Sequence, residues 1–197
     1  NDYVSLPNSI NMGTSDFTLS VRLNTDGIGS RQHVLQQTGT NSNRVIAINS
    51  DGSLTSRLGG TGSDHDSGVD LSAGTWYHIV LVHDNSANTI KWYVNGTEQN
   101  TNSSVNIPSN DSPFYLGINA NANDKEFDGK IDEFRIWDDV RTAPEILQYY
   151  KRSITNPYDE DNLVFYCRMN NGTGDVVFDH SAKKNHGEFS GMDNNDW

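Results

Sequence analysis

The chain has one cysteine in 197 residues, Cys167, so it cannot form a disulfide within itself. A chain of this length buries roughly 70% of the surface that its unfolded form exposes, and it therefore needs no disulfide to fold. Long apolar runs are also absent. None approaches the ~18 residues of a membrane-spanning helix, which argues against insertion into a membrane. Asn1 does not begin a signal peptide, and we expect the chain to be one domain of a larger multidomain protein.

Basic residues are scarce as well. The sequence has 14 Lys and Arg against 26 Asp and Glu, which gives a formal net charge of −12. Proteins bind nucleic acid through many Lys and Arg side chains that displace counterions from phosphates, so this balance argues against a nucleic-acid partner. The composition is rich in Asn, Ser, Thr, Gly and Asp, as in many bacterial extracellular modules. We therefore expect the protein to be secreted or to lie at the cell surface.

Catalytic and zinc-binding signatures are missing from the sequence. It contains no Gly-x-Ser-x-Gly motif, no phosphate-binding loop and no Ser/His/Asp motif. The six histidines show no His-x-x-x-His spacing and have no cysteine partner, which argues against a zinc site.

Short runs of β-branched and aromatic residues recur along the chain, separated by clusters of Gly, Asn, Asp and Ser. This pattern is typical of an antiparallel sandwich rather than of alternating strands and helices. The predicted strands are residues 3–6, 17–23, 33–37, 44–49, 53–58, 76–83, 89–94, 114–118, 129–137, 162–169 and 188–190. Asp51-Gly52 and Asn95-Gly96 are hairpin turns, because Gly tolerates positive φ, and the second leads into a polar strand.

One segment, about 142–151, predicts a short surface helix. Thr142 can cap its first turn, and Glu145 follows three residues later as the partner in a capping box. A linker around Pro157 then breaks the pattern, and a strand resumes at Asn162.

Several segments carry a family resemblance. The strand Gly129–Trp137, with residues 141–146 after it, is similar to the closing strand and helix of laminin G-like jelly rolls. Further pieces agree in order, namely residues 2–7, 17–20, 75–80 and 91–96. The chain thus resembles a laminin G-like, concanavalin A-like lectin domain over residues 2–146. This resemblance implies an all-β, two-sheet antiparallel jelly-roll sandwich that binds a glycan or polysaccharide.

The tail resembles the segment that usually opens such a domain, through residues 163–166, 171–174, 179–181 and 185–187. Residues 160–197 therefore either complete the same sandwich in permuted order, which makes 1–197 one domain, or begin a second repeat. We favour the first arrangement, because Phe165, Val177 and Phe178 would otherwise have no core.

Asp132 lies in an otherwise apolar strand, where a carboxylate is costly unless it is paired or bound to a metal. Related glucanases use a similarly placed aspartate, with residues near the N-terminus, to bind a structural calcium, and this chain has Asp2 there. Two carboxylates with carbonyls and water can satisfy calcium. Pairing of Asp132 with Arg135 or a backbone amide is the alternative. Asp179 is a further candidate ligand, although an Asx-turn explains it equally well.

Two predicted loops, residues 59–68 and 119–128, are rich in short polar side chains, and we expect the strands that they flank to be neighbours. Loops at the rim of a sandwich carry function more often than its strands do. The residues in these loops that are candidates for binding a neutral or calcium-bridged acidic glycan are Asp64, His65, Asp66, Asn121 and Asp124. Acidic loops that bind nothing are the alternative.

The tryptophans Trp76, Trp92 and Trp137 lie in motifs of the family core, so packing explains most of them. Trp92 is the least certain, and with Arg57 it is the candidate for glycan binding on the concave sheet face.

Glucanases of this fold carry a Glu-x-Asp-x-x-Glu strand, which this chain lacks, and strand alternation predicts opposite faces for Asp132 and Glu133. We expect a non-catalytic, calcium-dependent lectin or adhesin module. A spacer or protein-interaction module is the alternative.

Overall fold

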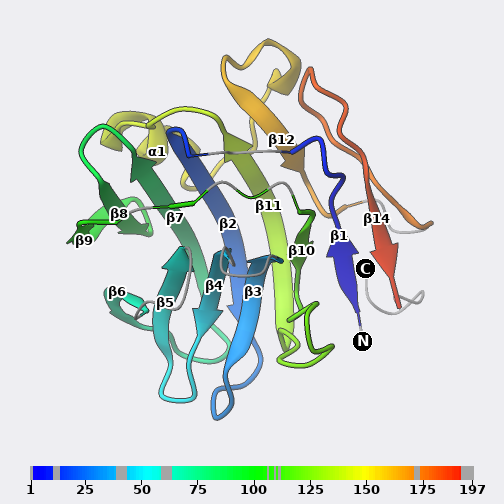
Figure 1. The fold of residues 1–197 in the computed structure, drawn as a ribbon. Coiled ribbons are helices and arrows are strands. Elements are labelled where there is room, and N and C mark those ends of the chain that lie inside the picture. Colours follow the sequence, from blue (N-terminus) through cyan, green and yellow to red (C-terminus); the bar gives the residue numbers. More distant parts are fainter. Residues whose placement is uncertain are drawn as a thin grey trace.

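Figure 1 shows the computed structural model of the chain, which consists of two β-sheets and a short helix. The structure describes residues 2–10, 14–38, 44–58, 64–105, 107–108, 110, 112–170 and 174–191. An eight-stranded sheet has the order β13-β14-β1-β10-β3-β4-β5-β6, and a six-stranded sheet has the order β12-β11-β2-β7-β8-β9. Every strand pairing is antiparallel. The predicted all-β sandwich is therefore confirmed.

The strands of the larger sheet are β1 (Tyr3–Ser5), β3 (Gln32–Gln37), β4 (Arg44–Ile48), β5 (Ser53–Leu58), β6 (His65–Asp70), β10 (Phe114–Leu116), β13 (Val176–Val177) and β14 (Gly187–Ser190). Those of the smaller sheet are β2 (Phe17–Thr25), β7 (Trp76–Asp84), β8 (Thr89–Val94), β9 (Thr97–Ser103), β11 (Gly129–Trp137) and β12 (Leu163–Cys167). Each predicted strand is present, with small shifts at its ends. The sequence pattern missed β6 and β13 and indicated β9 only as a polar strand.

The main core fills the space between the sheets. Alternate residues of β2 and β7 point into it, including Leu19, Val21, Ile79 and Leu81, as the period of two in a strand requires. A second cluster lies on the outer face of the smaller sheet, where Ile146 of the helix α1 (Ala143–Tyr149) packs on Val80, Val82 and Tyr93. The central strands of this sheet are therefore covered on both faces.

The helix begins with the capping box that the sequence predicts. The backbone N–H and the hydroxyl of Thr142 both donate to Oε2 of Glu145, at 2.7 and 2.6 Å. The backbone N–H of Ile146 donates to the carbonyl of Thr142 at 3.0 Å, which closes the first turn. The helix is shorter than predicted and ends at Tyr149.

The tail contributes strands to both sheets. β12 pairs with β11 in the smaller sheet, and β14 pairs with β1 in the larger one, as Figure 1 shows in orange and red. Phe165 and Val177 are buried in the main core. Phe178 is 50% exposed, so the expectation that it needs a core is wrong.

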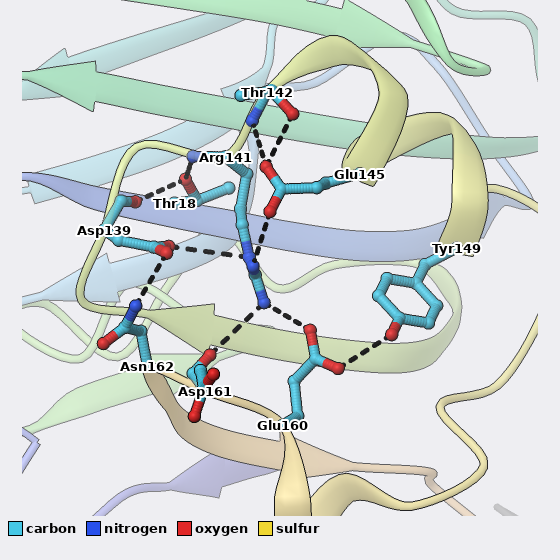
Figure 2. A network of polar contacts seen from close by, with 9 residues as sticks. All are labelled: Thr18, Asp139, Arg141, Thr142, Glu145, Tyr149, Glu160, Asp161 and Asn162. Atoms are coloured by element: carbon cyan, nitrogen blue, oxygen red, sulfur yellow. Dashed lines mark hydrogen bonds and ion pairs between the residues drawn. The ribbon is translucent and has the colours of Figure 1, made fainter.

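A polar network joins the end of β11, the helix and the start of β12 (Figure 2). The guanidinium of Arg141, which is 9% exposed, forms ion pairs with Glu145 at 3.1 Å, with Asp139 at 3.5 Å and with Glu160. The hydroxyl of Tyr149 donates to the other oxygen of Glu160 at 2.8 Å. These contacts hold the linker that contains Glu160 against the smaller sheet.

Strand β11 carries a bulge between Asp132 and Arg135, and Glu133 has φ 52°. The extra residue shifts the alternation, so Phe134 and Ile136 point into the main core and Arg135 points away from it. Glu133 is 5% exposed and pairs with Arg135 outside the main core cluster. The bulge overturns the expectation that simple alternation places the two carboxylates on opposite faces. Of the two alternatives for Asp132, pairing with Arg135 is absent, and a hydrogen bond from a backbone amide, that of Glu133, is present.

Candidate functional site

The first half of β11 lies at an open side of the sandwich. β12 pairs with β11 only from Phe134 to Trp137, so residues 129–133 have β2 on one side and, among the described strands, no partner on the other. A cavity of about 620 Å³ lies along this half of β11. Its size is within the range of roughly 300–1,000 Å³ that is usual for small-ligand sites. Its walls come from both sheets, through β1, β10 and β14 of one and β7 and β11 of the other.

The cavity has an aromatic wall. Trp76 opens β7 and is 43% exposed, because it alternates with Tyr77 and Ile79, which face the core. The guanidinium carbon of Arg22 lies 5.7 Å from the centre of its ring. The remaining aromatic and sulfur-containing side chains of the wall are Tyr3, Phe127, Met169 and Phe189. Such a surface can pack against the apolar face of a ligand.

The polar part of the lining is mostly acidic. It consists of Asp2, Asp26, Asp128 and Asp132, with Lys130 as the one basic lining residue among the described positions. Asp132 forms an ion pair with Arg22 at 3.8 Å. Burial, and then the charge of Glu133, raise the pKa of Asp132 above its usual value in spite of Arg22. The carboxylates can accept hydrogen bonds from hydroxyl or ammonium groups of a ligand.

Tight backbone packing shapes the cavity. Gly129 has φ 149°, and a Cβ at this position would lie 2.1 Å from the carbonyl oxygen of Asn24, so only glycine fits. The backbone of Asp128 forms hydrogen bonds through both its N–H and its carbonyl. Its N–H donates to Gln32 Oε1 at 3.0 Å, and its carbonyl accepts from the backbone N–H of Asp26 at 2.8 Å.

Two of the three predicted calcium ligands, Asp2 and Asp132, line this one cavity. Asp179 lies elsewhere and is 2% exposed. Its Oδ1 accepts from the N–H groups of Tyr166 and Ser181, each at 2.9 Å, and its Oδ2 accepts from Asn185 N at 2.7 Å. These hydrogen bonds match the turn that the sequence offered as the alternative. Among the described residues, no three His, Cys, Asp or Glu side chains gather so that they could hold a metal ion.

The first predicted rim loop holds an ion-pair cluster. Asp64 contacts Arg31 at 2.6 Å and Arg57 at 2.7 Å. Burial is the largest influence on the pKa of Asp64 and raises it, but the hydrogen bonds and charges of the two arginines outweigh it and lower the pKa. His65 and Asp66 belong to β6 rather than to a loop, which corrects the prediction, and residues 59–63 lie outside the described part of the chain.

The second predicted rim loop, residues 119–128, is held together by contacts among its own residues. Asn119 donates its side-chain N–H to Asp124, which also contacts Lys125 at 3.2 Å, and Asn121 is exposed in the turn between them. The two loops do not flank neighbouring strands, because β3, β4 and β5 separate β10 from β6. That expectation is corrected.

The two residues predicted to bind a glycan on the concave sheet face, Trp92 and Arg57, lie in different sheets. Trp92 is 0% exposed and lies in the main core, so it is not available for glycan stacking. Arg57 lies on β5 in the other sheet. The sequence reasoning instead missed Trp76, Asp26 and Asp128. The sequence could have indicated that Trp76 lies outside the core, because alternation along the strand places it on the same face as His78 and Val80 and on the opposite face from the core residue Ile79.

The fold and the cavity define a β-sandwich with a ligand-sized site at its side. The chain belongs to the concanavalin A-like lectin/glucanases superfamily, whose laminin G-like family model matches residues 1–147. No curated protein sequence matches it significantly.

Solved structures share the fold. A Bacteroides ovatus protein to which carbohydrate binding has been provisionally assigned has a TM-score of 0.80 and 22% identity over 98% of this chain, which spans 57% of that protein's length. Domain 4 of AbnA, an extracellular arabinanase from Geobacillus stearothermophilus, in complex with arabinotriose, has a TM-score of 0.57 and 21% identity, with 73% of this chain and 70% of that one covered. Ruminococcus gnavus IT-sialidase CBM40, bound to α2,3 sialyllactose, has a TM-score of 0.56 and 16% identity, with 70% and 83% covered.

Proposed function

We propose that this chain is a non-catalytic carbohydrate-binding module of a secreted or cell-surface protein, and that it binds a glycan in the cavity beside the first half of β11. The observation that carries the proposal is the pairing of an exposed Trp76 with several carboxylates around one cavity. A sugar presents apolar C–H faces, which pack on an aromatic ring, and hydroxyl groups, which donate to carboxylates. Affinity should be micromolar to millimolar, because sugar–protein hydrogen bonds replace sugar–water ones at little net gain.

The structural relatives support two parts of the proposal, glycan binding and a location outside the cell. Two of them were solved with an oligosaccharide, arabinotriose in one and sialyllactose in the other, and one belongs to an extracellular arabinanase. In both cases the part that resembles this chain is a domain of a larger enzyme, which fits a module attached to other domains. The described residues contain no helix that is long and apolar enough to cross a membrane.

The chain lacks the Glu-x-Asp-x-x-Glu strand of related glucanases, and the environment of Glu133 excludes that residue from a catalytic role. A glycosidase needs a carboxyl group that can reach the scissile bond. Glu133 is 5% exposed, and its oxygens accept hydrogen bonds from Tyr166 and Ser153, each at 2.7 Å, and from Arg135. A carboxylate held in this way has no oxygen facing a ligand.

Calcium is the second element of the proposal, with Asp2 and Asp132 as its protein carboxylates. Because no group of three acidic side chains among the described residues could hold the ion, its other ligands would be backbone carbonyls, water or the hydroxyl groups of the sugar. An ion bound only by the native protein raises stability by mass action, so chelation should lower the melting temperature. An unchanged melting temperature in excess chelator would remove calcium from the proposal and leave the glycan site standing.

A glycan array followed by titration calorimetry tests the site. Trp76→Ala should weaken binding of the best glycan at least tenfold, which is about 1.4 kcal/mol. The matched control is Tyr158→Ala, which removes another exposed aromatic ring, 65% exposed and on the short helix η1 (Pro157–Asp159), and should bind like the parent. Unchanged binding by Trp76→Ala would place the site elsewhere. If the parent binds no glycan at millimolar concentration, the spacer or protein-interaction alternative takes its place.

A further inference from the structure

The proposed glycan site extends into a second cavity with the same charge. This cavity, of about 470 Å³, shares Phe127 and Asp128 with the first and is also lined by Glu126 and the connection from Gly27 to Ser30. The two cavities together are lined by five carboxylates, from Asp2, Asp26, Glu126, Asp128 and Asp132, and by one lysine, Lys130. A ligand that follows both cavities therefore passes a strongly negative surface.

Two of these acidic residues, Asp26 and Asp128, are neighbours through their backbones, and neither has an ion-pair partner among the described residues. Asp26 and Asp128 are exposed, and their backbones are joined by the 2.8 Å hydrogen bond from Asp26 N to Asp128 O. Within the described part of the chain neither forms an ion pair, whereas Asp132 has Arg22. In a chain of net charge −12, little else offsets their potential, so it favours a positively charged ligand.

The spacing of the charges favours an extended cation over a single ion. Among the described residues, no three acidic side chains converge on one point, so a single small ion would leave most of these charges without a partner. The carboxylates are instead distributed along two adjoining cavities beside an aromatic ring. That ring, Trp76, already has the guanidinium of Arg22 over it at 5.7 Å, which is the geometry of a cation–π contact.

We propose that the site selects glycans that carry ammonium groups, such as oligomers of glucosamine without acetyl groups, over neutral glycans of the same length. The inference rests on the proposed glycan site and adds its ligand class. Each ammonium group donates hydrogen bonds to Asp26 or Asp128, and the sugar ring packs on the aromatic wall. Charge-assisted hydrogen bonds of this kind are roughly twice as strong as neutral ones.

The test compares hexamers of glucosamine and of N-acetylglucosamine by calorimetry at about pH 6, both with calcium and in excess chelator, and at two salt concentrations. The glucosamine hexamer should bind at least tenfold more tightly at low salt, and the difference should shrink at high salt because ions screen exposed charges. The double variant Asp26→Asn/Asp128→Asn should lose this preference, so that it binds the two hexamers with similar affinity. The control Asp159→Asn/Asp175→Asn removes the same charge from exposed positions in the tail and should keep the preference.

Each other result has a definite meaning. Equal binding of the two hexamers, or no binding of either when another glycan binds the parent, would overturn this inference and leave the proposed function intact. No binding of either hexamer, with no glycan found on the array, would overturn both. If the double variant still prefers the glucosamine hexamer, groups other than Asp26 and Asp128 bind its ammonium groups. Equally tight, aspartate-dependent binding of a lysine-rich peptide would assign the acidic surface to a protein ligand.

Discussion

The tryptophans show how one position along a strand decides the role of a residue. Trp92 on β8 is opposite Leu81 of β7, and both side chains are completely buried in the main core. Trp76 lies on the other face of β7, beyond the reach of the helix, and reaches the cavity. Both residues occur in apolar family motifs, so composition alone did not distinguish a core residue from a surface one. The alternation along β7 distinguishes them once Ile79 is known to face the core.

The two tryptophans should differ sharply in their effect on stability. Trp92→Ala should lower the free energy of unfolding by about 3–5 kcal/mol, because it removes a large buried side chain and leaves a cavity. Trp76→Ala should cost less than about 1 kcal/mol, because its ring is partly in water already. Chemical denaturation measures both values. Similar costs for the two substitutions would mean that Trp76 packs in the core, as the family motif suggested.

At the scale of elements, local patterns and tertiary contacts contributed differently. The helix and its cap follow from Thr142 and Glu145, which are three residues apart. The missed strand β6 is polar, His-Asp-Ser-Gly-Val-Asp, and becomes a strand because its backbone pairs with β5 at the edge of the sheet. Edge strands are often short and polar, which protects the sheet from pairing with other chains. The network around Arg141 likewise depends on residues that the fold brings together.

The Arg141 network should contribute measurably to stability through Glu160. Glu160→Ala leaves the largely buried guanidinium of Arg141 and the hydroxyl of Tyr149 each without one partner, and we expect a loss of about 2–3 kcal/mol in the free energy of unfolding. The control is the exposed neighbour Asp159→Ala, which should change stability by less than about 0.5 kcal/mol. Equal losses in the two variants, measured by urea denaturation, would contradict a role for the network.

At the scale of the whole molecule, the tail strands occupy positions in both sheets. β12 covers the second half of β11, and β14 covers β1. Where β12 ends, the side of the sandwich opens and the cavity begins. The tail therefore both packs into the core, through Phe165, and sets the boundary of the candidate site.

Removing the tail should destabilise the rest of the sandwich. A chain that ends at Pro157 loses Phe165 and Val177 from the core and exposes the paired edges of β11 and β1. We expect it to be unfolded or to melt well below the full chain, as followed by circular dichroism. Melting at the temperature of the full chain would instead show that residues 160–197 begin a separate domain.

Buried histidines should make the fold sensitive to mild acid. Burial, with the charges of Arg135 and Arg22, lowers the pKa of His78 to about 3, and burial, with Arg31 and Lys125, lowers that of His33 to about 4. The unfolded chain binds these protons near pH 6.5, so the stability contributed by neutral histidine is complete above that pH and is lost as the pH falls toward the folded pKa values.

When the pH falls from about 7 to about 5, the free energy of unfolding should fall by about 1–2 kcal/mol for each of these histidines. His78→Gln should remove its share of this pH dependence, whatever the substitution does to stability at pH 7. Urea denaturation at the two pH values measures the difference. A variant with the same pH dependence as the parent would show that His78 titrates normally in the folded protein.

The sequence by itself determined the features that depend on neighbouring residues. Alternating apolar positions marked most strands, Asx-Gly pairs marked hairpins, and Thr142 with Glu145 marked the start of the helix. These features are predictable because the residues that produce them are in contact as soon as the local backbone forms. The family resemblance added the sandwich and directed attention to Asp132 and Asp2, which the structure places in one cavity.

Only the tertiary structure decided the candidate site. The cavity requires β12 to stop beside Phe134, Asp26 to lie next to Asp128 and Asp132 to face Arg22 instead of Arg135. Each of these contacts joins residues that are far apart in the sequence or that depend on the bulge at Glu133. A bulge or a shift of one residue in register turns side chains to the other face of a strand, and the packing of both sheets together determines where it occurs. The same packing buried Trp92 and left Trp76 at the surface.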